Sequence, residues 1–473
     1  MNPGQPDAGD QGNPAAQAER AASGGRLLSV LGLAFGLAGS VGGTIGAGIL
    51  RTPGLVAAQL PSAPLVLGAW LLGGLYALLG AVCIAELAAS LPRAGGWYVY
   101  AERAFGRRAG ALVGWTDWLA HCIGLAWVAT TAGELLAALL PDGAPAAAAQ
   151  ALALLILALF TAIQLLGVRA GGASQELLSL AKAAAFLGLV AVCFLRPSPF
   201  HPEPVASGLS GEPTALALAG VLALQAVITT YDGWASPVYF AEEFSDPGRD
   251  LPRSLIGGVL AVLALYLLIN LALLHVLPLR LLAQATLPAA DAARALLGPA
   301  GGGVITAVAL VALLGLINTV VMAAPRILYG LGRDGLLPGL LAGVNAGGTP
   351  VPALLITAGG AALLVLAGSF ERLLGMGAFL YVGLPLVGVA ALLWLRRREP
   401  DLERPFRSWG YPLTPLLVGA VSLAFLLAAL WSDTLNSLLA LALAAAGSAL
   451  LQQTPGLAQA AGLAEVAREG DHR

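Results

Sequence analysis

The sequence predicts an all-α polytopic membrane protein with twelve transmembrane helices. Of its 473 residues, 58% are hydrophobic and only 11% are charged, whereas soluble globular proteins average ~25% charged residues. A soluble chain of this length could not cover its apolar surface with so few charges. Apolar runs of about 18 residues or more, each typical of a spanning helix, recur along the chain. The short alternating strands of a membrane barrel do not appear in the pattern. A soluble enzyme, a disordered chain and a disulfide scaffold are therefore excluded.

The apolar runs define a transporter domain at 26–452 with a polar tail at each end. The predicted spans are 27–57, 62–90, 108–140, 145–167, 173–196, 214–241, 254–277, 300–333, 351–367, 371–395, 410–430 and 434–452. Residues 1–25 are polar and rich in Gly, Ala, Asp and Gln, so we expect a disordered tail. Residues 453–473 are expected to form a second soluble tail.

The positive charges indicate how the chain is oriented. If both termini are cytoplasmic, eighteen of the 23 arginines fall in cytoplasmic segments and five fall on the other side. Those five are Arg51, Arg196, Arg280, Arg294 and Arg372. Because loops rich in Lys and Arg stay in the cytoplasm, we expect both termini there. The near balance of 24 basic and 26 acidic residues argues against a nucleic-acid partner.

The first predicted span is interrupted in its middle. As one helix, residues 27–57 would measure ~46 Å at ~1.5 Å per residue, against a hydrocarbon core of ~30 Å. Glycines occupy positions 42, 43, 46 and 48, and each costs a helix ~1 kcal/mol relative to Ala. Freed backbone groups at membrane depth survive where they line a cavity or contact a ligand. Close packing of small residues against another helix is the alternative explanation.

The sixth predicted span repeats this signature, because Asp232, Gly233 and Pro237 interrupt its apolar run. Breaks at corresponding positions suggest repeats at about 27–196 and 214–395, and paired breaks indicate the midplane site of a transporter. N–H groups at the start of an outer half-helix favour an anion, and freed carbonyls favour a cation, so a zwitterion fits both. The predicted substrate-binding residues are Thr44, Ile45, Gly46, Ala47, Gly48, Ile49, Thr229, Thr230, Tyr231, Asp232, Gly233 and Trp234.

Four groups of short motifs follow one another along the chain. They are GAGIL at 46–50, AEL with LPRAGG and two tyrosines at 85–100, YDGW with EE and PGRDLPRS at 231–254, and PR, Tyr and RDG with Pro at 325–338. Together they resemble the amino acid–polyamine–organocation superfamily, and within it the L-type amino acid transporter branch. The resemblance implies a LeuT-like fold, a five-plus-five inverted repeat with discontinuous helices 1 and 6 and with helices 11 and 12 (about 410–452) outside it. It also implies alternating access with the amino acid backbone bound at the two breaks.

Two positions depart from the motifs of that family. Trp97 stands where many members carry a Glu, and Thr229 stands where the family commonly carries a large aromatic gate. Either another aromatic such as Tyr231 occludes the site, or the pocket accepts a bulkier substrate side chain. The sequence leaves both alternatives open.

Lys182 is the one cation inside a predicted span, where a charge costs ~2.5–3.5 kcal/mol on insertion scales. In sodium-independent members of the family a helix 5 lysine supplies the charge that sodium supplies in related transporters, and Lys182 matches it in position. The resemblance therefore implies a coupling role in which Lys182 ties helix 1 near Gly42 to helix 8 near Asn318. A lysine that snorkels to the membrane surface is the alternative.

Other ionisable residues carry weaker expectations. Asp232 either selects cationic side chains or caps the broken helix, and Glu86 and Asp117 are expected to serve packing or gate contacts. Glu242 and Glu243 are expected to pair with arginines such as Arg249, Arg253 or Arg326. His121 and His275 look isolated, so we expect structural roles for both.

These features predict a sodium-independent amino acid transporter of the bacterial inner membrane, either an exchanger or proton-coupled. The expected substrate is a zwitterionic, neutral amino acid, and a cationic amino acid or polyamine exchanger is the alternative. The sequence offers no cluster of catalytic side chains, no metal spacing and no nucleotide motif, so we expect neither an enzyme nor a cofactor. It gives no support for a heavy-chain partner of the kind that animal members use.

Overall fold

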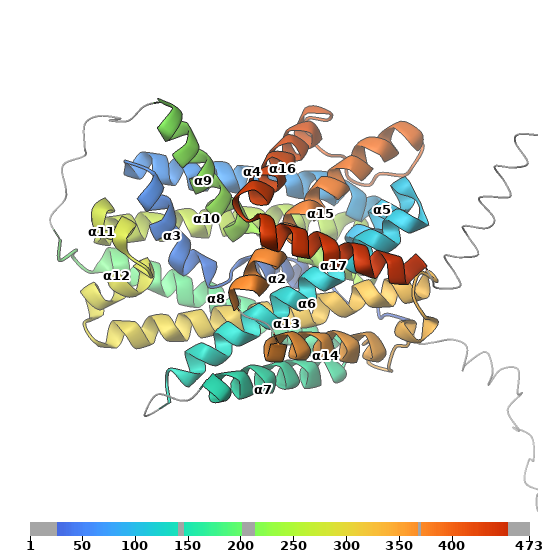
Figure 1. Ribbon diagram of the computed structural model, residues 1–473, viewed down its shortest axis with the longest axis horizontal. Coiled ribbons are helices and arrows are strands. Elements are labelled where there is room, and N and C mark those ends of the chain that lie inside the picture. Colours follow the sequence, from blue (N-terminus) through green and yellow to red (C-terminus); the bar gives the residue numbers. More distant parts are fainter. Residues whose placement is uncertain (1–25, 141–145, 201–212, 368–369, 453–473) are drawn as a thin grey trace, which may run out of the picture.

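The computed structural model describes residues 26–140, 146–200, 213–367 and 370–452, and most of them lie in helices (Figure 1). Within those ranges, nine helices are long and apolar enough to cross a membrane. A tenth span is added if the bent pair α2 (Leu33–Thr44) and α3 (Gly48–Gln59) counts as one. The predicted helical, multi-pass membrane architecture is therefore confirmed. The total of twelve spans and the inverted repeat stay predictions, and both predicted tails lie outside the described residues.

The other long helices begin and end close to the boundaries of the apolar runs. They are α4 (Ala63–Ser90), α6 (Arg107–Ala137), α7 (Ala146–Leu165), α8 (Val168–Leu195), α9 (Pro213–Tyr231), α10 (Pro247–Val276), α13 (Ala300–Arg333), α14 (Val351–Ala367), α15 (Phe370–Arg398), α16 (Leu413–Ser432) and α17 (Thr434–Gln452). Helices keep their backbone hydrogen bonds internal, as hydrocarbon surroundings require. Runs of Leu, Ala, Val and Gly with few charges therefore fold as spans.

Several short elements connect the spans and were not predicted. They are α5 (Trp97–Phe105), α11 (Leu279–Gln284), α12 (Pro288–Leu297) and the 3-10 helices η1 (Ser236–Glu243) and η2 (Gly339–Ala342). Each is shorter than the ~18 residues that identify a span by its apolar length. Of these, η1 matters most here because it continues the interrupted sixth span.

Helix α2 of the first interrupted span lies inside the bundle, whereas α9 of the sixth span is largely exposed at its surface. Helix α2 packs against α8, α10 and α13, while α9 packs against α3 and α4. Helix α6 crosses the bundle and contacts α7, α13, α14 and α15. The last two helices, α16 and α17, lie outside this core and pack mainly on α4, α6 and α15 (Figure 1). Neighbouring helices therefore flank both breaks.

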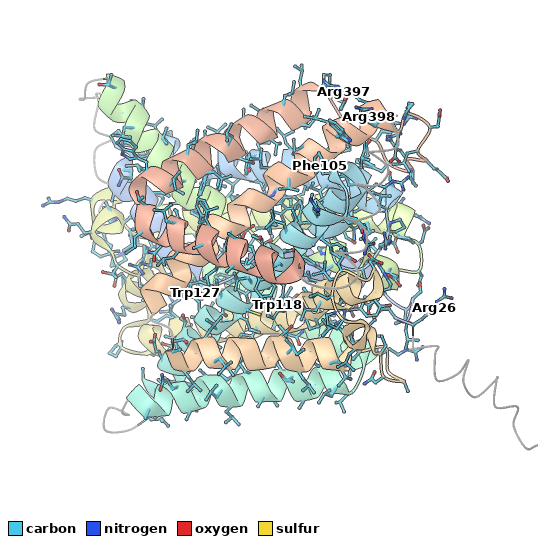
Figure 2. The ribbon with its side chains drawn as sticks, turned by 45° about the vertical axis from the view of Figure 1, so that its right-hand side comes forward. Arg26, Phe105, Trp118, Trp127, Arg397 and Arg398 are labelled. Carbon is cyan, nitrogen blue, oxygen red and sulfur yellow. The ribbon has the colours of Figure 1, made fainter. Side chains whose placement is uncertain are left out.

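One end of the bundle collects arginines, and we call it the arginine-rich end. Arg26, Arg397 and Arg398 lie toward this end in Figure 2. The chain just before α2 is joined here to the chain just after η1. The N–H of Leu31 donates to the carbonyl of Glu243, and the N–H of Ser245 donates to the carbonyl of Leu31, both at 2.9 Å.

Candidate functional site

The break in the first span separates α2 from α3, which meet at an angle of 49°. It occupies residues 45–47, within the predicted glycine cluster. Within the described part of the chain, the N–H groups of Gly46, Ala47 and Gly48 make no hydrogen bond. They stand at the start of α3, where the helix dipole favours an anion. The donors predicted for a substrate carboxylate are the N–H groups of Ala47, Gly48 and Ile49, and those of Ala47 and Gly48 are among these free groups.

The break in the sixth span has a different form. Helix α9 ends at Tyr231, and the chain resumes at Ser236 as the 3-10 helix η1. Gly233 adopts a positive φ of 99°, which L side chains rarely adopt. Its carbonyl accepts a 2.7 Å hydrogen bond from the Ser236 hydroxyl. Glycine is needed at this position because the turn takes the chain through a left-handed conformation.

The two breaks touch each other through backbone atoms. A Cβ atom on Gly233 would lie 2.2 Å from the carbonyl oxygen of Gly43, and a Cβ on Gly43 would lie 2.6 Å from the carbonyl oxygen of Gly233. Neither position has room for a side chain. The structure thus brings the predicted binding segments 44–49 and 229–234 to a common place in the bundle.

Tyr266 on α10 bridges the two breaks. Its hydroxyl lies 3.1 Å from the carbonyl oxygen of Thr44 and 3.2 Å from that of Thr230. Its ring lies 5.0 Å from that of Tyr231, and the hydroxyl of Tyr231 donates to the carbonyl of Trp70. Sequence reasoning missed Tyr266, because a tyrosine in an apolar run looks like a core residue. The predicted span 254–277 places Tyr266 near its middle, and this position of a polar hydroxyl at membrane depth is the only signal that the sequence offers.

Lys182 on α8 is fully buried and donates two hydrogen bonds to the α2 side of the first break. Its Nζ lies 2.7 Å from the carbonyl oxygen of Gly42 and 2.9 Å from that of Ile45. These are carbonyls that the end of α2 leaves without helical partners. The side chain also packs against Gly315 of α13, where an added Cβ would lie 2.3 Å from its Cε. Lys182 therefore stays inside the bundle instead of reaching the membrane surface.

Asn318 does not contact Lys182, although both were predicted to act together. Its side chain belongs to an amide cluster, in which it pairs with Gln164 at 2.9 Å and Gln175 at 2.8 Å. Gln175 in turn donates to the carbonyl of Ala38 in α2. The cluster joins α13 to α2 through Gln175 of α8, which lies about two helical turns before Lys182 on the same helix. The coupling roles of Lys182, Gly42 and Asn318 stay predictions.

Several carbonyls expected to bind the substrate ammonium already have partners. The carbonyl of Ile45 accepts a hydrogen bond from Lys182. The carbonyls of Thr44 and Thr230 both lie within hydrogen-bond distance of the Tyr266 hydroxyl. A carbonyl oxygen has a second lone pair, so these contacts do not prevent substrate binding. Thr229, which stands in place of the aromatic gate, is exposed and bonds within its own helix to the carbonyl of Gln225.

A small cavity lies beside the second break. Asp232, Gly233 and Tyr239 line it from the region of the break, His121 from α6, and Tyr381 from α15. Its lining joins a part of the predicted binding segment to residues that sequence analysis assigned no role in binding.

His121 is not isolated, contrary to expectation. Its Nδ1 lies 3.1 Å from a carboxylate oxygen of Asp117, one helical turn earlier on α6. The Tyr239 hydroxyl donates to the same oxygen at 3.0 Å. The spacing of four between Asp117 and His121 puts both on one face of a helix, and this signal in the sequence could have found the pair.

The arginine-rich end is held by ion pairs on either side of η1. Glu243 accepts two hydrogen bonds from Arg326, at 2.9 and 3.0 Å, and both side chains are buried. Glu242 pairs with Arg333. The predicted pairing of Glu243 with Arg326 is therefore found, whereas Arg333 was not among the arginines proposed for Glu242.

Asp334 continues this network just after α13. It accepts hydrogen bonds from Arg333 and Tyr98, at 2.9 Å each, and pairs with Arg93 at 2.5 Å. Burial alone would raise the pKa of the Asp334 carboxyl, but the hydrogen bonds and charges of Arg333, Tyr98 and Arg93 outweigh it and lower that pKa below its ordinary value.

Glu86 forms a separate anchor at the same end. It accepts hydrogen bonds from Arg396 at 2.7 and 2.5 Å and from the N–H of Ser408 at 2.7 Å. Arg404 lies 3.1 Å from the same carboxylate. The segment after α15 is thereby fixed to α4, in line with a packing role for Glu86. Among the described residues, no group of three His, Cys, Asp or Glu side chains is placed to hold a metal ion.

Comparison with known proteins agrees with this architecture. The family model described as "Amino acid permease" matches residues 26–447. The serine/threonine exchanger SteT of Bacillus subtilis is 28% identical over 431 residues, covering 89% of this chain and 95% of its own. The rat large neutral amino acids transporter small subunit 2 is 29% identical over 441 residues, covering 90% and 81%. The mouse Asc-type amino acid transporter 1 is 30% identical over 405 residues, covering 84% and 75%. This chain therefore belongs to the amino acid permease family of the amino acid–polyamine–organocation superfamily.

Proposed function

We propose that this permease is a sodium-independent exchanger of zwitterionic, neutral amino acids in a bacterial inner membrane. Both termini lie in the cytoplasm, on the arginine-rich side of the bundle. The substrate carboxylate binds the N–H groups of Ala47, Gly48 and Ile49 at the start of α3. The substrate ammonium binds backbone carbonyls of the two breaks, and alternating access moves the bound amino acid across the membrane.

The observation that carries this proposal is the position of Lys182. Its ammonium group sits against the carbonyls of Gly42 and Ile45, at the break itself. A buried cation that supplies a fixed positive charge there removes the need for a bound sodium ion. The relatives' names, a serine/threonine exchanger and a large neutral amino acids transporter, support the same substrate class.

A cationic amino acid or polyamine exchanger is the second candidate, because Asp232 adds a carboxylate beside the binding segment. The two candidates are separated by competition uptake in proteoliposomes. We expect leucine, serine or threonine to compete better than lysine, arginine or putrescine. In Asp232→Gly, an increased preference for neutral over cationic substrates would favour the second candidate in the wild type.

The test begins with thermal unfolding of the purified protein in detergent, in the presence of each of the amino acids and common polyamines. A ligand at a hundred times its Kd stabilises the folded state by about 2.7 kcal/mol, so binding is readily seen. Each stabilising amino acid is then used in counterflow, with sodium replaced by choline in a parallel sample. We expect equal counterflow in both salts. Failure of every amino acid to stabilise or exchange would contradict the proposed transport, and a requirement for sodium would contradict the role of Lys182.

A further inference from the structure

The cavity beside the second break contains a cluster of ionisable side chains. Two carboxylates and one imidazole belong to it: Asp232 and His121 line it, and Asp117 lies behind His121. Among the residues described as lining it there is no Lys or Arg. With both carboxylates ionised and the imidazole neutral, the cluster would carry two uncompensated negative charges inside the membrane, which is costly.

The hydrogen bonds of His121 decide which of its nitrogen atoms is free. Nδ1 lies 2.9 Å from the backbone carbonyl oxygen of Asp117 and 3.1 Å from its carboxylate. Both neighbours are acceptors, so Nδ1 carries the hydrogen, and Nε2 of the neutral ring holds a lone pair. Within the described residues Nε2 has no hydrogen-bond partner. The histidine therefore offers one proton acceptor at the cavity.

Asp117 provides a second, independent observation. Its side chain is fully buried, and one carboxylate oxygen accepts from Tyr239 and His121. The other oxygen, Oδ2, has no partner in the described structure. Buried polar atoms are seldom left unpaired. A carboxylate in this position stabilises a positive charge on the adjacent imidazole.

The cavity is suited to water rather than to a large side chain. The cavity volume open to water is about 40 Å³, and a single water needs about 10–15 Å³. Two or three waters therefore fit between His121 and Asp232. His121 is otherwise buried, with 5% of its surface exposed, and it lines this cavity.

We propose that His121 is a proton-binding site that links protonation to movement of the second break, an inference that rests on the proposed transport function. Hydronium delivered through the cavity waters gives its proton to Nε2, so that an O–H bond breaks, an N–H bond forms and water remains. The imidazolium then forms an ion pair with Asp117 and attracts Asp232 across the cavity. Because Asp232 belongs to the break itself, protonation holds the break against α6, and deprotonation releases it.

The groups that face His121 come from every element around the cavity. Asp117 is on its own helix, Asp232 and Tyr239 belong to the break and η1, and Tyr381 is on α15. The tyrosines stay neutral over the physiological range, so the two carboxylates are the groups that set the protonation of the imidazole.

The test measures amino acid exchange in proteoliposomes as a function of pH. For the wild type we expect the rate to change by about threefold or more between about pH 5 and 8, where histidine titrates. His121→Gln keeps a polar side chain of similar size but binds no proton, so its pH profile is expected to be flat. His275→Gln is the matched control, because His275 is an exposed histidine that packs against Phe194, and its profile should match the wild type. Superimposable profiles for His121→Gln and the wild type would overturn the proposal.

A second measurement does not depend on transport. With ¹⁵N-labelled histidine in detergent micelles, the NMR signal that is absent from His121→Gln should titrate in the same pH range. Asp117→Asn removes the counter-charge with little change in shape, so the midpoint of that titration should move to lower pH. An NMR signal that does not titrate, or a midpoint unmoved in Asp117→Asn, would overturn the proposal. If the wild type exchanges no amino acid, the proposed function fails while this titration still decides the proton site.

Discussion

The break between α2 and α3 and the break between α9 and η1 both free backbone groups inside the bundle, yet different chemistry stabilises them. At the first break the cation Lys182, which lies on the neighbouring helix α8, donates hydrogen bonds to two carbonyls at the end of α2. Beyond the second break the anions Glu242 and Glu243 tie η1 to arginines at the end of α13. The first break is held at the break itself, whereas these ion pairs hold the second span seven and eight residues beyond its break.

The contact of Lys182 is expected to stay in place during movement, whereas the ion pairs of η1 are expected to be released. Lys182 lies fully buried against its two carbonyls, so the contact has no competing water. The two ion pairs of η1 differ in exposure: the side chain of Glu243 is buried, whereas that of Glu242 is 30% exposed. Water competes with exposed ion pairs and weakens them. Movement of η1 is therefore easiest to start at Glu242 and hardest at Glu243.

The largest effect that would test this comparison is expected from Glu243→Gln. It leaves the Arg326 guanidinium buried without a counter-charge, and breaking such a pair costs about 3–5 kcal/mol. Glu242→Gln is the matched control next to it, and we expect a loss within about 1 kcal/mol because that pair is partly exposed. Thermal unfolding in detergent measures both variants. Equal losses would show that burial does not distinguish the two ion pairs.

A smaller loss of stability is expected from Lys182→Met, which keeps the volume and removes the donors. The carbonyls of Gly42 and Ile45 lose their partner, at a cost of about 3 kcal/mol. The transport rate should fall even at temperatures where the variant remains folded, because the angle between α2 and α3 is no longer fixed. Arg169→Met is the control, since it removes an exposed cation from the same helix. Full transport in Lys182→Met would contradict a fixed first break.

Gly315→Ala sharpens the same point without removing any charge. Its added Cβ would lie 2.3 Å from Cε and 3.0 Å from Nζ of Lys182, and such overpacking costs about 1–2 kcal/mol. Gly303→Ala on the same helix meets nothing within 4 Å. It should be neutral or stabilising by up to about 1 kcal/mol, because Ala favours a helix over Gly. Unfolding temperatures and exchange rates of the pair separate packing against Lys182 from helix propensity.

The smallest effect concerns pH and Asp334. Since its pKa is lowered in the folded protein, the stability it contributes is complete above the ordinary carboxyl value of 3.8 and is lost as pH falls through the lower, folded value. Its partner Arg93 is 45% exposed, so the contribution is about 1 kcal/mol or less. Wild type and Asp334→Asn should therefore differ in unfolding temperature at neutral pH and converge in acid. A difference that grows in acid would contradict the sign.

Much of the fold could be predicted because hydrocarbon surroundings leave few choices. An apolar run long enough to span has to be a helix, so the limits of α4, α13 and α14 follow from composition. The breaks were also visible, since Gly42 to Gly48 and Asp232 to Pro237 disfavour a continuous helix. The buried position of Lys182 followed from its place in the middle of a run.

The remaining parts depend on contacts between distant residues. Tyr266 acts through two carbonyls more than thirty residues away, and no local pattern marks that use. Asn318 was assigned to the lysine from the family resemblance, but its amide group bonds instead to Gln164 and Gln175, which come from two other helices. His121 seemed isolated because its spacing of four from Asp117 was overlooked and because Tyr239 and Asp232 come from the distant sixth span.

The paired backbone bonds between Leu31 and the chain around Glu243 have a mechanical consequence. Two hydrogen bonds of 2.9 Å, reinforced by the Ser29 hydroxyl on the carbonyl of Phe244, join the entrance of α2 to the exit of η1. Such a bridge transmits a pull from either segment to the other. We therefore expect α2 and η1 to move as one unit. The contact of Gly43 with Gly233 lies at one end of this unit, and the ion pairs of Glu242 and Glu243 with arginines lie at the other.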